Sequence, residues 1–125
     1  MSDEQPFDFS ILDRVGAPHR RYGPGEKVFL EEDTGNAMYM VRSGRVDLIT
    51  YGIILENVRS GGVFGEMALI DDGPRSAAAI AAEPTEVVVI DKPTFIAVVG
   101  ADPQFALKVM GLLATRLRRM NKQVG

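Results

Sequence analysis

The 125-residue chain contains no cysteine and a single histidine, His19. Without cysteine it can form neither a disulfide nor a cysteine-ligated zinc or iron-sulfur site, and one histidine cannot build a multi-histidine metal centre. We therefore expect no metal and no cofactor. Metal-dependent enzymes with a small β fold need several histidines, so the same shortage argues against an enzyme of that class.

Long hydrophobic runs are also missing. The longest apolar runs, residues 77–82 and 87–90, are far shorter than the roughly 20 residues that a membrane-spanning helix needs. The first residues, MSDEQPFDF, are acidic and lack the basic and then apolar pattern of a secretory signal. We therefore expect a cytoplasmic protein with no membrane partner.

The chain has no surplus of positive charge. It carries 14 lysines and arginines against 17 aspartates and glutamates, a formal net charge of -3. Nucleic-acid-binding modules usually show a basic surplus gathered on one face, so direct binding to nucleic acid is not favoured. At this length, with 46% hydrophobic residues, the chain should form one domain with a single core.

The hydrophobic pattern divides the predicted domain, residues 1–125, into three parts. Residues 1–17 should form a helical segment, with a short helix from Phe7 to Val15. Residues 18–91 contain six short β-favouring runs separated by glycine-bearing turns: EKVFL, AMYMVRS, RVDLITY, IILENV, AAAIAA and EVVVI. Such runs favour an antiparallel sandwich, jelly roll or small barrel. Residues 92–125 should form two helices, the second starting at Asp102 and Pro103.

The last predicted helix has one apolar face. Its apolar residues recur every three or four positions at Phe105, Val109, Leu112, Leu113, Leu117, Met120 and Val124. This stripe could pack on the domain or pair with a second copy, so both a monomer and a homodimer stay open. The basic end of the helix, residues 116–122, is predicted to be a solvated face.

The stretch FGEMALIDDGPRSAAAIA, residues 64–81, has the features of an anion cradle. Gly65 allows close backbone approach, and residues 66–70 can form one helical turn whose free N–H groups face an anion. After the turn, Arg75 can offer two charge-assisted hydrogen bonds to phosphate oxygens. The small residues that follow keep the wall behind Arg75 thin.

The acidic residue of this stretch, Glu66, needs a donor. An ionised carboxylate only accepts hydrogen bonds and would repel a phosphate, so a ligand hydroxyl is its natural partner. A ribose phosphate carries both groups in a fixed geometry. The alternative is that Glu66 and Arg75 simply bridge two loops.

The same stretch resembles the phosphate-binding cassette of cyclic nucleotide-binding domains, whose pattern is FGE, a variable residue, AL, a spacer, then PR, a small residue and A. The upstream VFLEEDTGNAMYMVRSGRVDL resembles the first signature of this family, with Glu32 at the position of the usual first glycine. DPQFALKVMGLLATRLRRMNK is similar to the long helix of the catabolite activator protein family. The resemblance implies a mainly β fold, an antiparallel jelly roll (double-stranded β-helix) with a short N-terminal helix and two C-terminal helices.

The resemblance also implies the site residues. Glu66 would accept the ribose 2′-hydroxyl, and Arg75 would pair with the cyclic phosphate. The remaining expected cassette contacts are Gly65, Met67, Ala68, Ser76 and Ala77. The expected sugar and base contacts are Leu48 and Leu55, with Met120 and Asn121 of the last helix capping or bonding the purine.

The expected ligand is cyclic AMP, with measurable binding of cyclic GMP. In the family a threonine after the arginine is associated with guanine selectivity, and Ser76 leaves the choice open. The implied function is a non-catalytic sensor whose last helix moves over the bound base and signals to an unknown effector protein. Two alternatives stay open: the effector domain of a transcription regulator, channel or kinase, and a jelly-roll enzyme.

Overall fold

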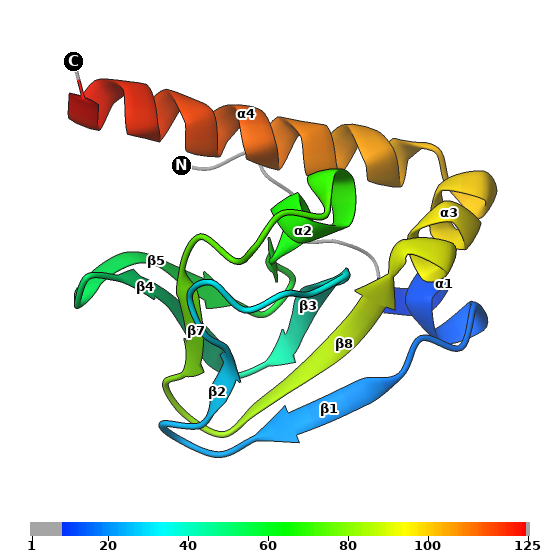
Figure 1. Ribbon diagram of the computed structural model, residues 1–125. Coiled ribbons are helices and arrows are strands. Elements are labelled where there is room, and N and C mark those ends of the chain that lie inside the picture. The colour runs from blue at the N-terminus through cyan, green and yellow to red at the C-terminus, as the bar shows by residue number, and fades with distance from the viewer. Residues whose placement is uncertain (1–8, 125) are drawn as a thin grey trace.

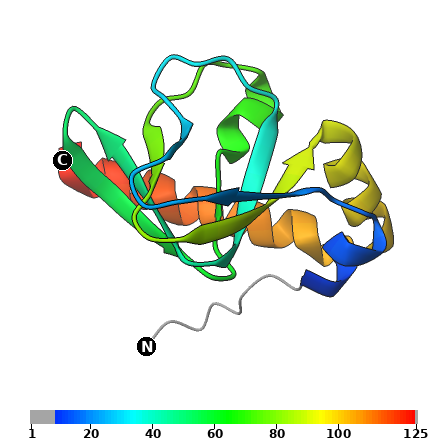
Figure 2. The same cartoon turned by 90° about the horizontal axis from the view of Figure 1, so that it is seen from below.

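The computed structural model describes residues 9–124, with side chains from Ser10 to Arg119, and shows a β sandwich with helices along one side (Figure 1). The helices are α1 (Phe9–Arg14), α2 (Glu66–Asp71), α3 (Lys92–Ala101) and α4 (Gln104–Val124). The strands are β1 (His19–Tyr22), β2 (Lys27–Phe29), β3 (Ala37–Ser43), β4 (Arg45–Thr50), β5 (Ile53–Arg59), β6 (Val63–Phe64), β7 (Ala78–Ala81) and β8 (Thr85–Asp91). Seen from below, α4 runs behind the sandwich, and α1 and α3 gather at one end of it (Figure 2).

The strands form two four-stranded antiparallel sheets, in the orders β1-β8-β3-β6 and β2-β7-β4-β5. Successive strands alternate between the sheets, except where the β4-β5 hairpin stays within one. This is the strand order of a jelly roll. The predicted mainly β fold, with a short helix before the sandwich and two helices after it, is confirmed.

The strands β3 and β8 lie at the centre of the fold and are buried on both faces. In β3, Tyr39 and Val41 pack between the two sheets, whereas Met38 and Met40 pack against the helices. The alternation follows from the strand repeat of two residues. It explains why AMYMV and VVVI are continuous apolar runs in the sequence.

The helix-side core anchors α4. Phe105 and Val109 are 2% and 3% exposed and pack with Val98 of α3 and Leu69 of α2. Asp91 caps α3 by accepting a hydrogen bond from the backbone N–H of Thr94 at 2.9 Å. The first half of α4 is therefore fixed against the sandwich by apolar contacts.

Two strands were not among the six runs predicted from the sequence. The edge strand β1 is exposed along most of its length, so its sequence HRRY shows no apolar alternation. The strand β6 has only two residues, Val63 and Phe64, and pairs with β3 through both of them. A run of two residues is too short to show a period.

Within residues 9–124, no single helix is long and apolar enough to cross a membrane. Only α3 and residues 104–119 together reach that length and apolar character, and the two are bent by 119° relative to each other.

Candidate functional site

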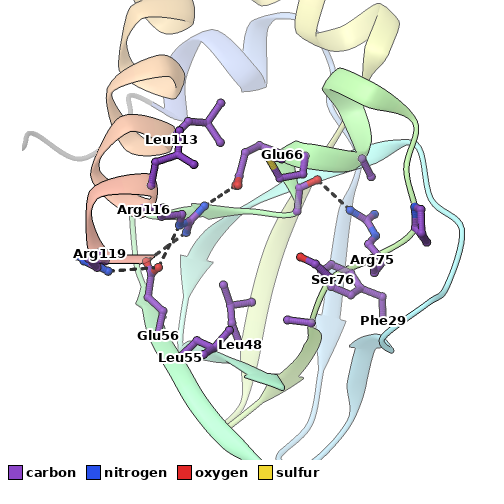
Figure 3. Close-up of a pocket in the computed structure, with 16 residues that line it drawn as sticks. Phe29, Leu48, Leu55, Glu56, Glu66, Arg75, Ser76, Leu113, Arg116 and Arg119 are labelled. Atoms are coloured by element: carbon purple, nitrogen blue, oxygen red, sulfur yellow. Dashed lines mark hydrogen bonds and ion pairs between the residues drawn. The ribbon is translucent and has the colours of Figure 1, made fainter. Parts of the chain in front are cut away.

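A cavity of about 400 Å³ opens between the cassette, the β4-β5 hairpin and α4 (Figure 3). Its lining residues are Phe29, Leu48, Leu55, Glu56, Gly65, Glu66, Met67, Ala68, Pro74, Arg75, Ser76, Ala77, Leu113, Arg116, Leu117 and Arg119. All seven predicted cassette residues line it, as do the two leucines expected near the sugar and base. Met120 and Asn121 lie in α4, but their side chains are outside the described residues. The sequence therefore located this cavity, while its use as a binding site stays a prediction.

Arg75 is fixed by hydrogen bonds to backbone groups of two segments, the cassette and the loop before β3. Its guanidinium is buried, and it donates from Nη1 to the carbonyl of Gly65 and from Nη2 to the carbonyl of Ala37, each at 2.8 Å. Its own backbone N–H donates to the carbonyl of Asp33 at 2.9 Å, and its carbonyl accepts from the N–H of Glu32 at 2.8 Å. Arg75 therefore ties the cassette to the loop before β3.

The guanidinium of Arg75 rests on an aromatic wall. Its central carbon lies 4.1 Å from the ring centre of Phe29 and 5.8 Å from that of Tyr39. Burial lowers the pKa of Arg75, although Tyr39 and the carboxylates nearby oppose that shift. Nε of Arg75 is buried and has no hydrogen-bond partner among the described residues. One donor of a buried cation is thus unused in a residue that lines the cavity.

Two glycines make room for this guanidinium. A Cβ on Gly35 would lie 2.6 Å from Nη2 of Arg75, and a Cβ on Gly65 would lie 2.9 Å from Nη1. Gly65 also has φ of 79°, a conformation that side chains other than glycine rarely adopt. The predicted role of Gly65, close approach of the backbone, matches this geometry.

Glu32 occupies the position at which the family resemblance calls for a glycine. Its φ is 70°, so the backbone keeps the left-handed conformation that a glycine would adopt freely. A residue with a side chain is strained in this conformation, so Glu32 carries a backbone cost that a glycine would not.

Glu66, the first residue of α2, is 4% exposed. Its Oε1 accepts a hydrogen bond from Nη1 of Arg116 at 2.5 Å. Glu66 and Arg75 form no direct bond with each other among the described residues; each is held by other groups. The two side chains therefore do not bridge two loops through a bond to each other, although each of them bonds to another segment of the chain.

The side chain of Arg116, at the mouth of the cavity, is only 16% exposed, so the expectation of a solvated face is wrong at this position. It donates from Nε and Nη2 to the two carboxylate oxygens of Glu56, at 3.0 and 3.1 Å, and from Nη2 to the carbonyl of Val63 at 2.8 Å. Burial alone would lower its pKa, but the hydrogen bonds to Glu56 and the charge of Glu66 raise it. Arg116 therefore stays charged between two carboxylates.

Sequence reasoning missed both Arg116 and Glu56 as residues of the site. The usable signal was helical spacing, because Arg116 follows Val109 by seven residues and so lies on the apolar face of α4. For Glu56, on the exposed-looking strand β5, the sequence offers no comparable signal. The two residues meet only because the fold brings α4 over the β4-β5 hairpin.

Among the described lining residues, the charged groups leave one positive charge in excess. Arg75, Arg116 and Arg119 face two carboxylates, Glu56 and Glu66. The rest of the lining is largely apolar, with leucines from β4, β5 and α4. Such a cavity suits a ligand that has one negative charge and an apolar part.

Comparison with known proteins identifies the family. The family described as the cyclic nucleotide-binding domain matches residues 19–102. The cyclic AMP receptor protein of Thermus thermophilus is 36% identical over 110 residues, 84% of this chain and 51% of that protein. A cAMP-dependent protein kinase regulatory subunit of Yarrowia lipolytica is 37% identical over 71 residues, 57% of this chain and 19% of that protein.

A solved structure agrees with these relatives. The crystal structure of the Thermus thermophilus catabolite activator protein superimposes with a TM-score of 0.81 at 34% identity, covering 92% of this chain and 57% of that one. This chain thus spans about half the length of the Thermus thermophilus regulator and a smaller part of the kinase subunit. Motif, fold and relatives agree, and the chain belongs to the cyclic nucleotide-binding domain family.

Proposed function

We propose that this domain is a non-catalytic sensor that binds cyclic AMP in the cavity between the cassette and α4. One observation carries the proposal: a buried arginine with an unused donor and a buried glutamate line one cavity with a single excess positive charge. A cyclic nucleotide has one phosphodiester charge, a ribose hydroxyl and an apolar base. The names of the relatives, a cyclic AMP receptor protein and cAMP-dependent kinase regulatory subunits, support the same ligand.

The anionic group of the ligand would bind at Arg75. Its Nε has no partner to lose, so it can donate to a phosphate oxygen while the bonds to Gly65 and Ala37 persist. Desolvated arginine donates strong, directional hydrogen bonds to phosphate. Ser76 and Ala77 follow on the same wall of the cavity, where their small size permits contact.

The ribose would bind at Glu66. Arg116 bonds to Oε1 of Glu66, and no bond to Oε2 is found among the described residues. That oxygen is the acceptor for the 2′-hydroxyl. Leu48 and Leu55 would then contact the sugar and base, and Met120 and Asn121 would reach the purine from α4.

The response would be a change in how α4 covers the cavity, read by an effector protein. The described lining contains no histidine and no group of metal ligands, which favours binding over turnover. Within this proposal cyclic GMP is a weaker second ligand, since Ser76 offers a hydroxyl near the base and sugar. No direct contact with nucleic acid or membrane is part of it.

The test is calorimetric titration with cyclic AMP, cyclic GMP and linear 5′-AMP. We expect one site that prefers cyclic AMP and rejects the linear dianion. Arg75→Lys keeps the charge but removes the Nε donor and the two Nη donors that bond to backbone carbonyls. This variant should weaken binding by about 2 kcal/mol or more. Arg59→Lys is the matched control, because Arg59 is exposed and does not line the cavity. No heat with either cyclic nucleotide, or equal affinity for 5′-AMP, would refute the proposal.

A further inference from the structure

α4 is attached to the sandwich in two physically different ways. Its first half is anchored by apolar side chains, since Phe105 and Val109 are buried in the helix-side core. Beyond Leu113, no buried apolar side chain fixes the described part of the helix. Among the described side chains, the ion pairs that link this second half to the rest of the domain come from Arg116 and Arg119, which contact Glu56 of β5 and Glu66 of α2.

Glu56 on β5 is the centre of this second attachment. Both of its oxygens accept from Arg116 in a fork, and its Oε1 also lies 3.5 Å from Nη1 of Arg119 (Figure 3). Glu56 and Arg116 are largely buried as side chains, at 21% and 16% exposed, whereas Arg119 is 58% exposed. One carboxylate of the β4-β5 hairpin therefore binds two successive turns of α4.

We propose that Glu56 is a positioning residue that clasps the second half of α4 over the cavity and thereby sets how long a bound ligand is retained. The second part of this inference rests on the function proposed above. The clasp itself is a property of the ligand-free protein and can be tested without a ligand.

The way in which Arg116 divides its donors between Glu56 and Glu66 supports this role. Because Glu56 takes Nε and Nη2 of Arg116, only Nη1 is left for Glu66, and it reaches Oε1 alone. A hydroxyl that binds Oε2 of Glu66 therefore does not have to displace α4. Arg116 can keep its stronger, two-bond contact with Glu56 while the ligand is bound.

Charge favours the closed position of α4 as well. If the second half of the helix lifts, Glu56 and Glu66 lose Arg116 together, and Glu66 keeps only the nearby charge of Arg75. Among the described residues Arg75 bonds to neither carboxylate, because its side chain donates to backbone carbonyls of the sandwich and cassette. The group that would hold the ligand's anion and the group that closes the helix are therefore separate, so retention can change while anion binding is kept.

Amide hydrogen exchange of the ligand-free full chain tests the clasp. In Glu56→Gln, exchange in residues 113–119 should become faster by about fivefold, the size expected for a partly exposed ion pair. Exchange in residues 104–109, which are anchored by the core, should stay as in the wild type. Glu83→Gln is the matched control. It removes the same charge as Glu56→Gln, but from an exposed turn that does not line the cavity. Unchanged exchange in residues 113–119 would overturn the clasp.

Dissociation of radiolabelled cyclic AMP after a chase with excess unlabelled cyclic AMP tests retention. We expect Glu56→Gln to raise the dissociation rate about fivefold, whereas the association rate of the anionic ligand should not fall, because the variant removes a negative charge from the cavity lining. A merely structural defect would instead lower the fraction of binding-competent protein. Arg119→Gln, which removes the exposed partner of the clasp, should act in the same direction with a smaller effect.

Salt provides an independent readout. Raising the salt concentration from about 0.1 M to about 1 M shortens the Debye length from roughly 10 Å to roughly 3 Å. Wild-type dissociation should become faster over this range, and Glu56→Gln should respond less. An unchanged dissociation rate in Glu56→Gln overturns the retention role. If the wild type binds no cyclic AMP, the proposed function and the retention role fail, and the exchange experiment still decides whether Glu56 clasps α4.

Discussion

Arg116 of α4 donates to the carboxylate of Glu66 in α2 across 50 residues of sequence, and the same guanidinium grips Glu56. The contact joins the last helix directly to the cassette. It is also a nearly buried charge pair, since the Glu66 and Arg116 side chains are 5% and 16% exposed. Breaking one side of such a pair leaves an uncompensated charge behind.

Arg116→Met should therefore lower the free energy of unfolding by about 2–4 kcal/mol, because Glu66 and Glu56 lose their shared counter-charge. Urea denaturation at pH 7 measures the loss. Adding Glu66→Gln to Arg116→Met should recover at least about 1 kcal/mol, since the buried carboxylate is then gone. A single-variant loss below about 0.5 kcal/mol would mean that the pair contributes as little as an exposed one.

Glu32→Gly should stabilise the domain by about 1 kcal/mol, because glycine adopts the left-handed conformation of residue 32 without the Cβ clash. Thermal or urea denaturation measures the gain. Glu31→Gly is the matched control, since Glu31 has no positive φ and the change should only add freedom to the unfolded chain. A loss of stability in Glu32→Gly, equal to that in Glu31→Gly, would contradict the prediction.

Gly65→Ala should destabilise the domain by about 2 kcal/mol, because a side chain is strained at φ of 79° and its Cβ would lie 2.9 Å from Nη1 of Arg75. The displaced guanidinium should also weaken cyclic AMP binding in calorimetry. Gly111→Ala is the control within α4, where a Cβ meets nothing within 4 Å. That change should stabilise the helix by about 0.5–1 kcal/mol. Equal effects of the two substitutions would exclude the close approach at Gly65 as the cause.

The cap of α3 should give a pH-dependent contribution to stability. Hydrogen bonds from the side chain and the backbone N–H of Thr94 lower the pKa of Asp91. Asp91→Ala should cost about 1 kcal/mol at pH 7. A lowered folded pKa means that this contribution is complete above the unfolded value of about 3.9 and disappears as the pH falls through the lower folded value.

Urea denaturation of Asp91→Ala and the wild type between about pH 7 and about pH 3 follows that loss. The difference between the two proteins should shrink toward the acid end. Asp91→Asn keeps a capping oxygen that does not titrate. The difference in free energy of unfolding between this variant and the wild type should therefore change with pH only through the ionisation of Asp91 in the wild type. A cost of Asp91→Ala that stays constant down to the acid end would contradict the assignment.

Phe29→Leu should weaken the seat of Arg75. The ring of Phe29 lies 4.1 Å from the guanidinium carbon, and leucine keeps most of the apolar volume without the aromatic face. A buried cation-π contact contributes about 0.5–2 kcal/mol. Urea denaturation of Phe29→Leu, Arg75→Lys and the double variant should give a coupling energy in that range. Strict additivity would show that the ring acts only as apolar filler.

Much of the fold could be predicted because local pattern and final environment agree. The run AMYMVRS is β3 to the residue, and Asp102 caps α4 as its position before Pro103 suggested. The strand β1 could not be found in this way, because an exposed edge strand needs no apolar alternation. Which face of β3 meets the helices was also hidden, since both faces are apolar.

The candidate site also has one part that could be predicted from the sequence and one part that could not. The cassette is contiguous in sequence, so Glu66 and Arg75 could be paired from their spacing and from the family motif. Glu56 and Arg116 are 60 residues apart and meet only after the hairpin and α4 have packed. No local rule connects them. The binding roles of the predicted residues, Met120 and Asn121 included, stay predictions.

The two hydrogen bonds from Arg75 to backbone carbonyls affect which variants a genetic screen would recover. The same side chain holds the cassette against the loop before β3 and would receive the anion, so cohesion and recognition cannot be lost separately at this position. Under the proposed function, a screen for variants that no longer bind cyclic AMP would recover substitutions at Arg75 together with low protein abundance. Variants that lose ligand retention at normal abundance should instead map to Glu56 and Arg119, which are partly exposed.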